Sequence, residues 1–194
     1  MEAATPRERL LDRAIDHIAR RGLSDLSLRE LAAAIGTSHR MLIHHFGSRA
    51  GLWAEVVRSV EARQRELLPE LLPDPVADPA EAMRAWWRHI SDPALWPNER
   101  LFFEVYGQAL QGRPGTEALL DGIVDTWVEP IAAVNEVAGM APAEARAHAR
   151  LGVAVTRGLR LDRLATGDRA GVDAAVESWI ALNEAARREP KAAA

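Results

Sequence analysis

Apolar residues recur at helical spacing along most of the chain, and the strict alternation that marks a half-buried strand is almost absent. Near the start, Leu10, Leu11, Ala14, Ile15 and Ile18 follow the three-and-four spacing of a single buried helix face. The same spacing returns in later segments. The pattern therefore predicts an all-α protein.

Capping residues indicate where the first two helices begin. Residues 5–8 (Thr-Pro-Arg-Glu) combine an N-cap hydroxyl, a proline at the first helical position and a glutamate that can bond back to the cap. Gly22 is placed to end this helix. Residues 27–30 (Ser-Leu-Arg-Glu) form a second capping box and open a short helix that stops at Gly36.

The remaining elements are also helical. A short helix is expected over residues 38–46, and Ser48 caps a long fourth helix that reaches Leu67. Prolines at positions 69, 73, 75 and 79 then favour a loop and a boundary in the chain. Beyond that loop the pattern predicts helices over 79–91, 97–111, 115–138, 142–166 and 168–188, with Pro130 kinking the third of these. We expect two domains: an N-terminal head of residues 1–47 and a C-terminal body of residues 48–194. The helix that starts at residue 48 connects the head to the body.

Charge is unevenly spread between these parts. Residues 1–65 carry eleven arginines and eight acidic residues, a balance of +3, so the rest of the chain carries −7 within the total of −4. A basic head suggests an anionic partner, although solvated arginines would give the same balance. The absence of cysteine excludes disulfides and thiolate chemistry. With no signal peptide and no long apolar run, a soluble cytoplasmic protein is expected.

Two short helices joined by residues 34–38, with a glycine where the chain reverses, form the sequence pattern of a helix-turn-helix. The segments RLLDRA (9–14), SLRELA (27–32), GTS (36–38) and HFGSRAGL (45–52), together with Gly22, resemble the N-terminal domain of the tetracycline-repressor-like (TetR) transcriptional regulators. The rest of the chain is similar only in being helical and of the right length. The resemblance implies that the protein binds operator DNA as a dimer. It also implies that a small ligand bound in the C-terminal domain releases the dimer from the DNA.

The second helix of the motif carries the candidate DNA contacts. Ser38 is the natural N-cap and can meet a phosphate. His39, Arg40, Met41 and His44 fall on turns that can face a major groove. Arg40 is the expected base reader, because a guanidinium can contact O6 and N7 of guanine together.

The resemblance adds phosphate contacts at helix starts, by Ser27, Arg29 and Arg49. The chain departs from the family at Ile43, where a tyrosine is usual, and at Met41, where a small hydroxyl residue is common. The complete expected DNA-binding set is Ser27, Arg29, Thr37, Ser38, His39, Arg40, Met41, His44, His45 and Arg49.

Single residues of this set also fit roles unrelated to DNA. Arg40 could be a solvated helix residue. His44 and His45 could suggest a metal, but adjacent helical side chains diverge by about 100° and no cysteine or nearby carboxylate completes a ligand set. We therefore expect no metal and no cofactor. Phe46 is expected to pack in the core rather than stack on a base.

Aromatic residues are frequent beyond the proline-containing loop, where five of the six tryptophans lie. Trp86 and Trp87 are consecutive, so they cannot both face one narrow core stripe. Aromatic walls with few polar groups are typical of a small-molecule pocket, and core packing is the alternative for each aromatic taken singly. His89 and Arg157 are candidates for orienting polar groups. The complete expected ligand-binding set is Trp86, Trp87, His89, Trp96, Phe102, Phe103, Tyr106, Trp127 and Arg157.

The last two helices carry apolar residues at helical spacing, with Gly158 inside the first of them. Glycine costs about 1 kcal/mol relative to alanine there, and a close approach of helices would explain it. The resemblance implies that two such helices from each subunit form a four-helix dimer interface. Packing within one chain is the alternative.

These features favour a ligand-responsive transcriptional regulator, most simply a repressor that a mainly apolar small molecule releases from DNA. An enzyme is disfavoured, because the chain has no nucleophile elbow, zinc-protease motif, phosphate-binding glycine loop or Glu-x-x-His pair. A helical protein-interaction module without DNA function is the remaining alternative. Salt-dependent binding to DNA fragments would separate it from a regulator.

Overall fold

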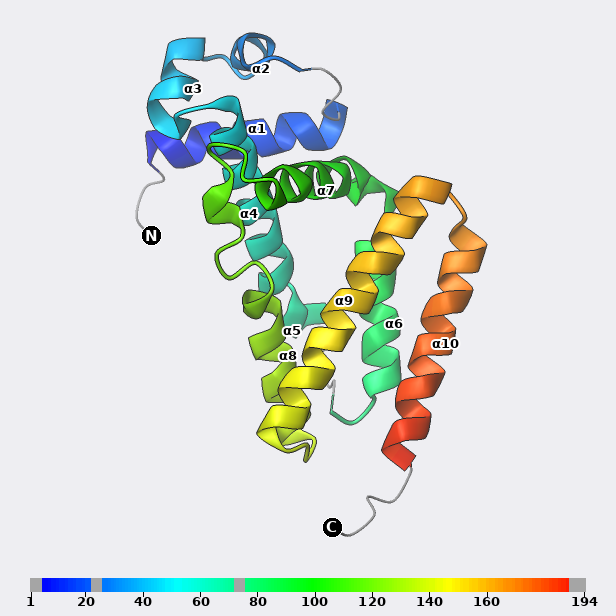
Figure 1. Cartoon of the computed structure of the whole chain (residues 1–194). Helices are drawn as coiled ribbons and strands as arrows, with labels where there is room; N and C mark the ends of the chain where they lie inside the picture. Colours follow the sequence, from blue (N-terminus) through cyan, green and yellow to red (C-terminus); the bar gives the residue numbers. More distant parts are fainter. Residues whose placement is uncertain (1–4, 22–25, 72–75, 189–194) are drawn as a thin grey trace. The chain divides into compact units, whose positions relative to one another are not determined.

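The expected all-α fold is confirmed (Figure 1). The computed structural model describes residues 5–21, 26–71 and 76–188, and these residues contain no strand. None of the helices in these ranges is both long and apolar enough to cross a membrane. The chain divides into two compact units: unit 1 is Met1–Leu67 with Pro93–Asp125, and unit 2 is Leu68–Asp92 with Thr126–Ala194.

Unit 1 holds the N-terminal helices and one later helix. Its elements are α1 (Pro6–Arg21), α2 (Leu28–Ala34), α3 (His39–Phe46), α4 (Arg49–Glu66), the short 3-10 turn η1 (Pro93–Leu95), α7 (Trp96–Leu110) and the 3-10 turn η2 (Glu117–Leu119). Helix α1 begins as its capping pattern predicts, because the N–H of Glu8 donates to Thr5 Oγ1 at 3.2 Å and the N–H of Thr5 donates to the Glu8 carboxylate at 2.7 Å. Its expected end at Gly22 lies outside the described residues.

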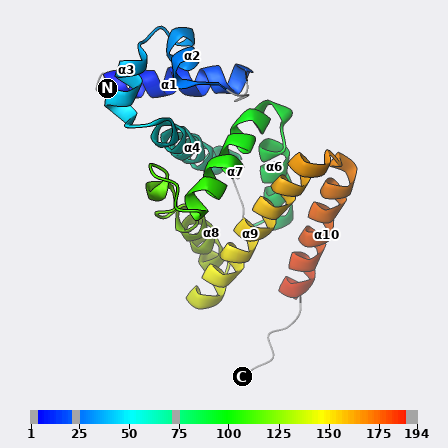
Figure 2. The same cartoon turned by 45° about the horizontal axis from the view of Figure 1, so that its top comes forward.

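One hydrophobic core holds unit 1 together. Ala14 and Ile18 of α1, Leu52 and Val56 of α4, and Val105 of α7 are completely buried in it. Helix α7 packs on both α1 and α4, and Figure 2 shows it beside α4. The core that supports the helix-turn-helix therefore continues past residue 47 into a segment from much later in the chain.

Unit 2 holds the remaining helices. These are α5 (Leu68–Leu71), α6 (Pro79–Ile90), α8 (Asp125–Val137), α9 (Pro142–Thr166) and α10 (Arg169–Arg188). Helices α9 and α10 run side by side in opposite directions, and α6 packs on α10 (Figures 1 and 2). Asp173 ties these helices together, because it accepts from Trp87 Nε1 of α6 at 2.8 Å and from Arg163 of α9 at 2.9 Å.

Four of the predicted body helices, α6, α7, α9 and α10, have ends within one residue of the expected ones. The expected helix over 115–138 is wrong in its first part, where the chain forms η2 and a turn before α8 begins at Asp125. Gly115 and Gly122 have φ values of +89° and +69°. A right-handed helix cannot pass through such residues, and glycine adopts them readily. Pro130 lies inside α8.

Candidate nucleic-acid interface and ligand cavity

The segment that joins α2 and α3 has the local structure that a helix-turn-helix requires. Ser27 and Glu30 cap α2 reciprocally, with the N–H of Glu30 donating to Ser27 Oγ at 3.3 Å and the N–H of Ser27 donating to the Glu30 carboxylate at 2.8 Å. Gly36 then reverses the chain at φ +68°, a conformation that glycine adopts without steric cost. Ser38 caps α3 by accepting the N–H of Met41 at 3.2 Å.

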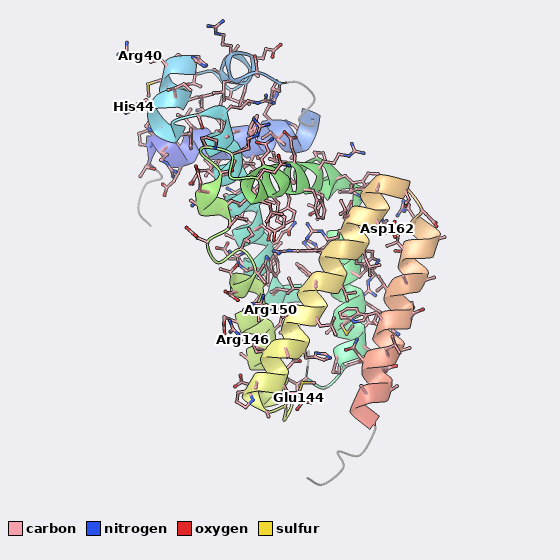
Figure 3. All side chains as sticks on the ribbon, viewed as in Figure 1. Arg40, His44, Glu144, Arg146, Arg150 and Asp162 are labelled. Atoms are coloured by element: carbon pink, nitrogen blue, oxygen red, sulfur yellow. The ribbon has the colours of Figure 1, made fainter. Side chains whose placement is uncertain are left out.

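Helix α3 buries one side and exposes the other. Leu42 and Phe46 are buried in the core of unit 1. Arg40 and His44 are four residues apart, so they lie on one side of the helix, and Figure 3 shows both on its outer side. Met41 beside them is 40% exposed. This exposed face carries donors and positive charge on a short helix that a major groove can accommodate.

The start of α4 adds a second cationic group to unit 1. Arg49 is exposed at the first position of the helix, and its guanidinium lies 5.9 Å from the ring centroid of Trp53. A buried tryptophan thus gives the arginine a partner that leaves its N–H donors available for a phosphate.

Most of the expected DNA-binding residues are exposed. The eight exposed ones are Ser27, Arg29, Ser38, His39, Arg40, Met41, His44 and Arg49. Thr37 and His45 are half-buried, and the His45 ring packs 6.2 Å from that of Phe46. The rings of His44 and His45 do not diverge as expected, because their centroids lie 5.0 Å apart in an edge-to-face contact. The described residues contain no cluster of three side chains able to hold a metal.

The capping box makes the start of α2 sensitive to acid. Hydrogen bonds from the side chain and backbone of Ser27 lower the pKa of Glu30 below its ordinary value. A lowered pKa in the folded state stabilises the fold above the ordinary pKa of glutamate, and this contribution is lost as the pH falls through the lowered value. Acidic solution therefore weakens the N-terminal cap of α2.

The loop after α7 packs closely against the start of α4. A Cβ atom on Gly115 would lie only 2.8 Å from Ser48 Oγ and 3.3 Å from the backbone nitrogen of Gly51. Ser48 Oγ itself accepts the N–H of Gly51 at 2.9 Å to cap α4. A Cβ on Gly51 would lie 2.3 Å from the carbonyl oxygen of Phe46. Glycine at both positions lets the end of α3, the start of α4 and this loop pack together.

Gly115→Ala is expected to lower the affinity for DNA more than Gly112→Ala does. Both glycines have positive φ, so each substitution costs about 1–2 kcal/mol of backbone strain. Only the Cβ on residue 115 would press on the cap of α4, because nothing lies within 4 Å of a Cβ on Gly112. Urea unfolding and DNA titration of both variants would measure the two effects. Equal losses of DNA affinity would contradict a positioning role for this loop.

A cavity of about 410 Å³ lies within unit 2, a size typical of small-molecule sites. Helices α5, α6, α8, α9 and α10 all contribute to its wall, which is mostly apolar. Four tryptophans line it: Trp86, Trp87, Trp127 and Trp179. The ring centroids of Trp86 and Trp127 are 5.4 Å apart, and the Trp179 ring lies 3.6 Å from where a Cβ on Gly152 would stand.

The polar groups of this cavity come mainly from α9. Thr156, Arg157 and Arg160 lie within two turns of one another, and Arg160 is only 7% exposed. His148 also lines the wall, and its Nε2 is 2.6 Å from Asn183 Oδ1. Few polar groups in an aromatic wall can orient a ligand while apolar contact supplies most of the affinity.

The structure brings four of the expected ligand-binding residues to this cavity: Trp86, Trp87, Trp127 and Arg157. The other five, Trp96, Phe102, Phe103, Tyr106 and His89, are not part of its lining. Phe102 and Tyr106 stack at 5.4 Å on α7, in and against the core of unit 1. His89 packs its ring 5.7 Å from that of Trp86.

Sequence reasoning missed several residues of the cavity wall. They include Met83, Asn135, His148, Thr156, Arg160 and Trp179. The spacing of Trp179 fits the apolar face of α10, so the sequence predicts it among the dimer helices instead. Amphipathic spacing does not distinguish a cavity wall from a helix interface, so the sequence holds no signal that separates the two.

Comparison with known families identifies the N-terminal part. The family model described as "Bacterial regulatory proteins, tetR family" matches residues 10–56, which run from α1 through the helix-turn-helix into α4. Residues 10–56 are TetR-like. The TetR match contains the exposed face of α3 and the start of α4, and it ends before the first residue that lines the cavity.

The chain shares its fold with solved proteins over nearly its whole length, and several of these are described as transcriptional regulators. A transcriptional regulator from Rhodococcus sp. Rha1 is 24% identical with a TM-score of 0.71, covering 92% of this chain and 95% of its own. The multidrug binding protein EbrR, complexed with imidazole, is 25% identical with a TM-score of 0.62, covering 98% of each chain. A putative regulator from Saccharomonospora viridis, in complex with choline, is 21% identical with a TM-score of 0.67, covering 94% and 96%. A comparison with curated proteins gives no match.

Proposed function

We propose that this chain, with its TetR-like N-terminal part, is a repressor that binds operator DNA as a dimer. A mainly apolar small molecule then releases the dimer from the DNA. The observation that carries the proposal is the separation of two sites on one chain. An exposed cationic helix face lies in unit 1, and an aromatic cavity of ligand size lies in unit 2. A regulator needs such a separation, because allostery requires two distinct sites whose occupancies are coupled.

The ligand site is supported by the aromatic wall and by relatives. EbrR is named a multidrug binding protein, and the regulator from Saccharomonospora viridis was solved with choline. In this chain the tryptophans of the cavity favour ring-containing or other bulky apolar molecules. The lining residues occupy helices on every side, so a ligand there would contact several helices at once.

The points at which the chain passes between the two units offer a route by which ligand binding in unit 2 can affect DNA binding by unit 1. Unit 2 is joined to unit 1 at three points along the chain, after residues 67, 92 and 125. Leu68 and Pro69 line the cavity directly after the first of these points, and Trp127 lines it two residues after the last. A ligand that displaces these residues pulls on the end of α4, whose first turn carries Arg49. The DNA-bound and ligand-bound arrangements then differ in the spacing of the two recognition helices.

Titration with a varied library of apolar compounds tests this coupling. Ligands are expected to quench tryptophan fluorescence and to weaken operator binding by about 5- to 150-fold, the usual size of an allosteric coupling. Operator DNA must weaken ligand binding by the same factor. Ligands that bind the cavity without any change in DNA affinity would contradict the repressor mechanism.

Trp127→Leu should lower ligand affinity about tenfold through loss of the aromatic contact with Trp86, and leave ligand-free DNA binding unchanged. Trp96→Leu is the matched control, because Trp96 is a half-buried tryptophan of unit 1 outside the cavity lining. Equal losses in the two variants would place the ligand elsewhere.

The dimer is proposed to form through α9 and α10. Leu151 and Leu161 of α9 are 56% and 49% exposed, and Leu182 of α10 is 69% exposed. Gly158 stands between the two α9 leucines with nothing within 4 Å of a Cβ placed on it. The close approach that would explain this glycine is therefore not made inside one chain, which favours a second copy as the partner. Paired recognition helices also need a fixed spacing to read two half-sites.

Gly158→Leu is expected to weaken the dimer and operator affinity together, because a leucine side chain would hold the facing helices apart. The folded monomer should not be destabilised, since glycine is about 0.8–1 kcal/mol less favourable than alanine in a helix and leucine ranks just below alanine. Ala133→Leu places the same side chain at an exposed site on α8 and should change neither property. Sedimentation and DNA titration measure both, and a fully dimeric Gly158→Leu variant would move the interface elsewhere.

A DNA-binding regulator works where the chromosome is, so we place this protein in the cytoplasm and assign it no catalytic activity. A protein-interaction module that kept the helix-turn-helix without its DNA function is the competing proposal. Failure of any DNA fragment to be enriched by the protein would favour that module.

A further inference from the structure

The described ionisable groups of the cavity wall are all basic, and they all come from one helix. In the described part of the lining the ionisable side chains are Arg157, Arg160 and His148, and no aspartate or glutamate is among them. All three belong to α9. The cavity therefore presents cationic and hydrogen-bond-donating groups on one helix and apolar side chains around most of the rest.

The two arginines stand together. Residues 157 and 160 are three apart on α9, so their side chains leave the same side of the helix, about 5–6 Å apart at Cβ. Each also interacts with other groups of the protein. A guanidinium has five N–H donors and no acceptor. The edge that each arginine presents to the cavity can thus only donate, and it suits a ligand atom that accepts.

The aromatic side chains of the cavity lie within the length of a small molecule from Arg157 and Arg160. Gly152, beside the Trp179 ring, precedes Arg157 by five residues and Arg160 by eight, or about 8–12 Å along the helix. Trp86 and Trp127 supply a second aromatic surface from α6 and α8. A molecule with an aromatic ring and a short chain that ends in a polar group has the length to reach from one region to the other.

We propose that the effector of this cavity is an aromatic or aliphatic carboxylate, with its oxygens on Arg157 and Arg160 and its hydrocarbon part between the tryptophans. The inference rests on the proposed function, in which this cavity is the effector site. Aromatic walls also suit quaternary ammonium ions. Such cations are disfavoured here, because the described lining offers two guanidinium groups and no carboxylate to balance a positive ligand.

Three compounds with one hydrocarbon skeleton test the charge preference: 4-phenylbutyrate, 4-phenylbutyramide and 4-phenylbutyl-trimethylammonium. Calorimetric titration of the whole protein is expected to rank the carboxylate first, about 10- to 100-fold tighter than the amide, as charge-assisted hydrogen bonds predict. The cation should bind most weakly. A cation that binds as tightly as the carboxylate, or an amide of equal affinity, would overturn the inference.

Arg157→Gln is expected to remove most of the advantage of the carboxylate over the amide. Arg157 is half-buried rather than part of the inner core, which makes it a safer substitution than Arg160. The matched control is Arg146→Gln on the same helix, whose guanidinium pairs with Glu129 at the surface (Figure 3). The control should keep the carboxylate preference. A variant at residue 157 that weakens all three compounds equally would show general disruption and overturn the assignment.

The outcomes separate this inference from the proposed function. If the amide or the cation binds best and releases operator DNA, the cavity is an effector site and only the carboxylate assignment fails. If none of the three compounds binds, the carboxylate assignment fails. If the wider apolar library also releases no DNA, the repressor proposal fails with it.

Discussion

Raising the salt concentration from 50 to 200 mM is expected to weaken operator binding by at least about 10³-fold, the lower end of the range for proteins that contact 6 to 10 phosphates. Arg29, Arg40 and Arg49 are exposed on each head, so a dimer brings six such arginines to the DNA. Each cation that neutralises a phosphate releases a counterion, and added salt opposes that release.

Fluorescence anisotropy with a labelled operator at several salt concentrations would measure this slope. Dimer mass by sedimentation over the same range is the control, because loss of the dimer would also weaken DNA binding. A dimer that persists while DNA affinity stays constant would contradict a cationic DNA-binding face.

Arg40→Ala is expected to weaken operator binding by about 1–3 kcal/mol per half-site and to relax the preference at particular base pairs. Arg40 lies on the outer side of α3, the side free to enter a groove (Figure 3). Because a dimer carries two copies, the total loss approaches about 2–6 kcal/mol. Stability should change by less than about 0.5 kcal/mol, since the side chain is exposed.

Arg49→Ala is the matched variant. Its guanidinium stands at the start of α4 over Trp53, where a phosphate contact is expected, so its loss should weaken all DNA sequences alike and reduce the salt slope by about one per copy. Selection of bound fragments from random DNA with each variant compares the two preferences. Identical changes in base preference would show that Arg40 does not read bases.

The ends of the first helices could be predicted because the interactions that set them are local. Ser38 and Ser48 each accept an N–H from three residues ahead, so the sequence contains both partners of each cap within one turn. The exposed side of α3 follows from the same local geometry, since burial of Leu42 and Phe46 leaves Arg40 outward.

The segment from 115 to 124 could not be predicted in the same way. Its residues include good helix formers, and their pattern predicts the first part of a long helix. In the fold, Gly115 takes a positive φ that brings the loop against the cap of α4, more than sixty residues earlier in the chain. Contacts over such separations leave no periodic signal in the sequence.

The sequence by itself determined that the chain is helical, where most helices begin and end, which side of α3 is exposed, and that the body holds more aromatic residues than one core stripe per helix accommodates. Only the tertiary structure decided which aromatics share a space. Phe102 and Tyr106 of α7 pack in the core region under the helix-turn-helix, whereas Trp86, Trp127 and Trp179 border the cavity of unit 2. The physical reason is that amphipathic spacing specifies that a side chain turns away from water, while the neighbour it meets depends on how helices distant in sequence pack.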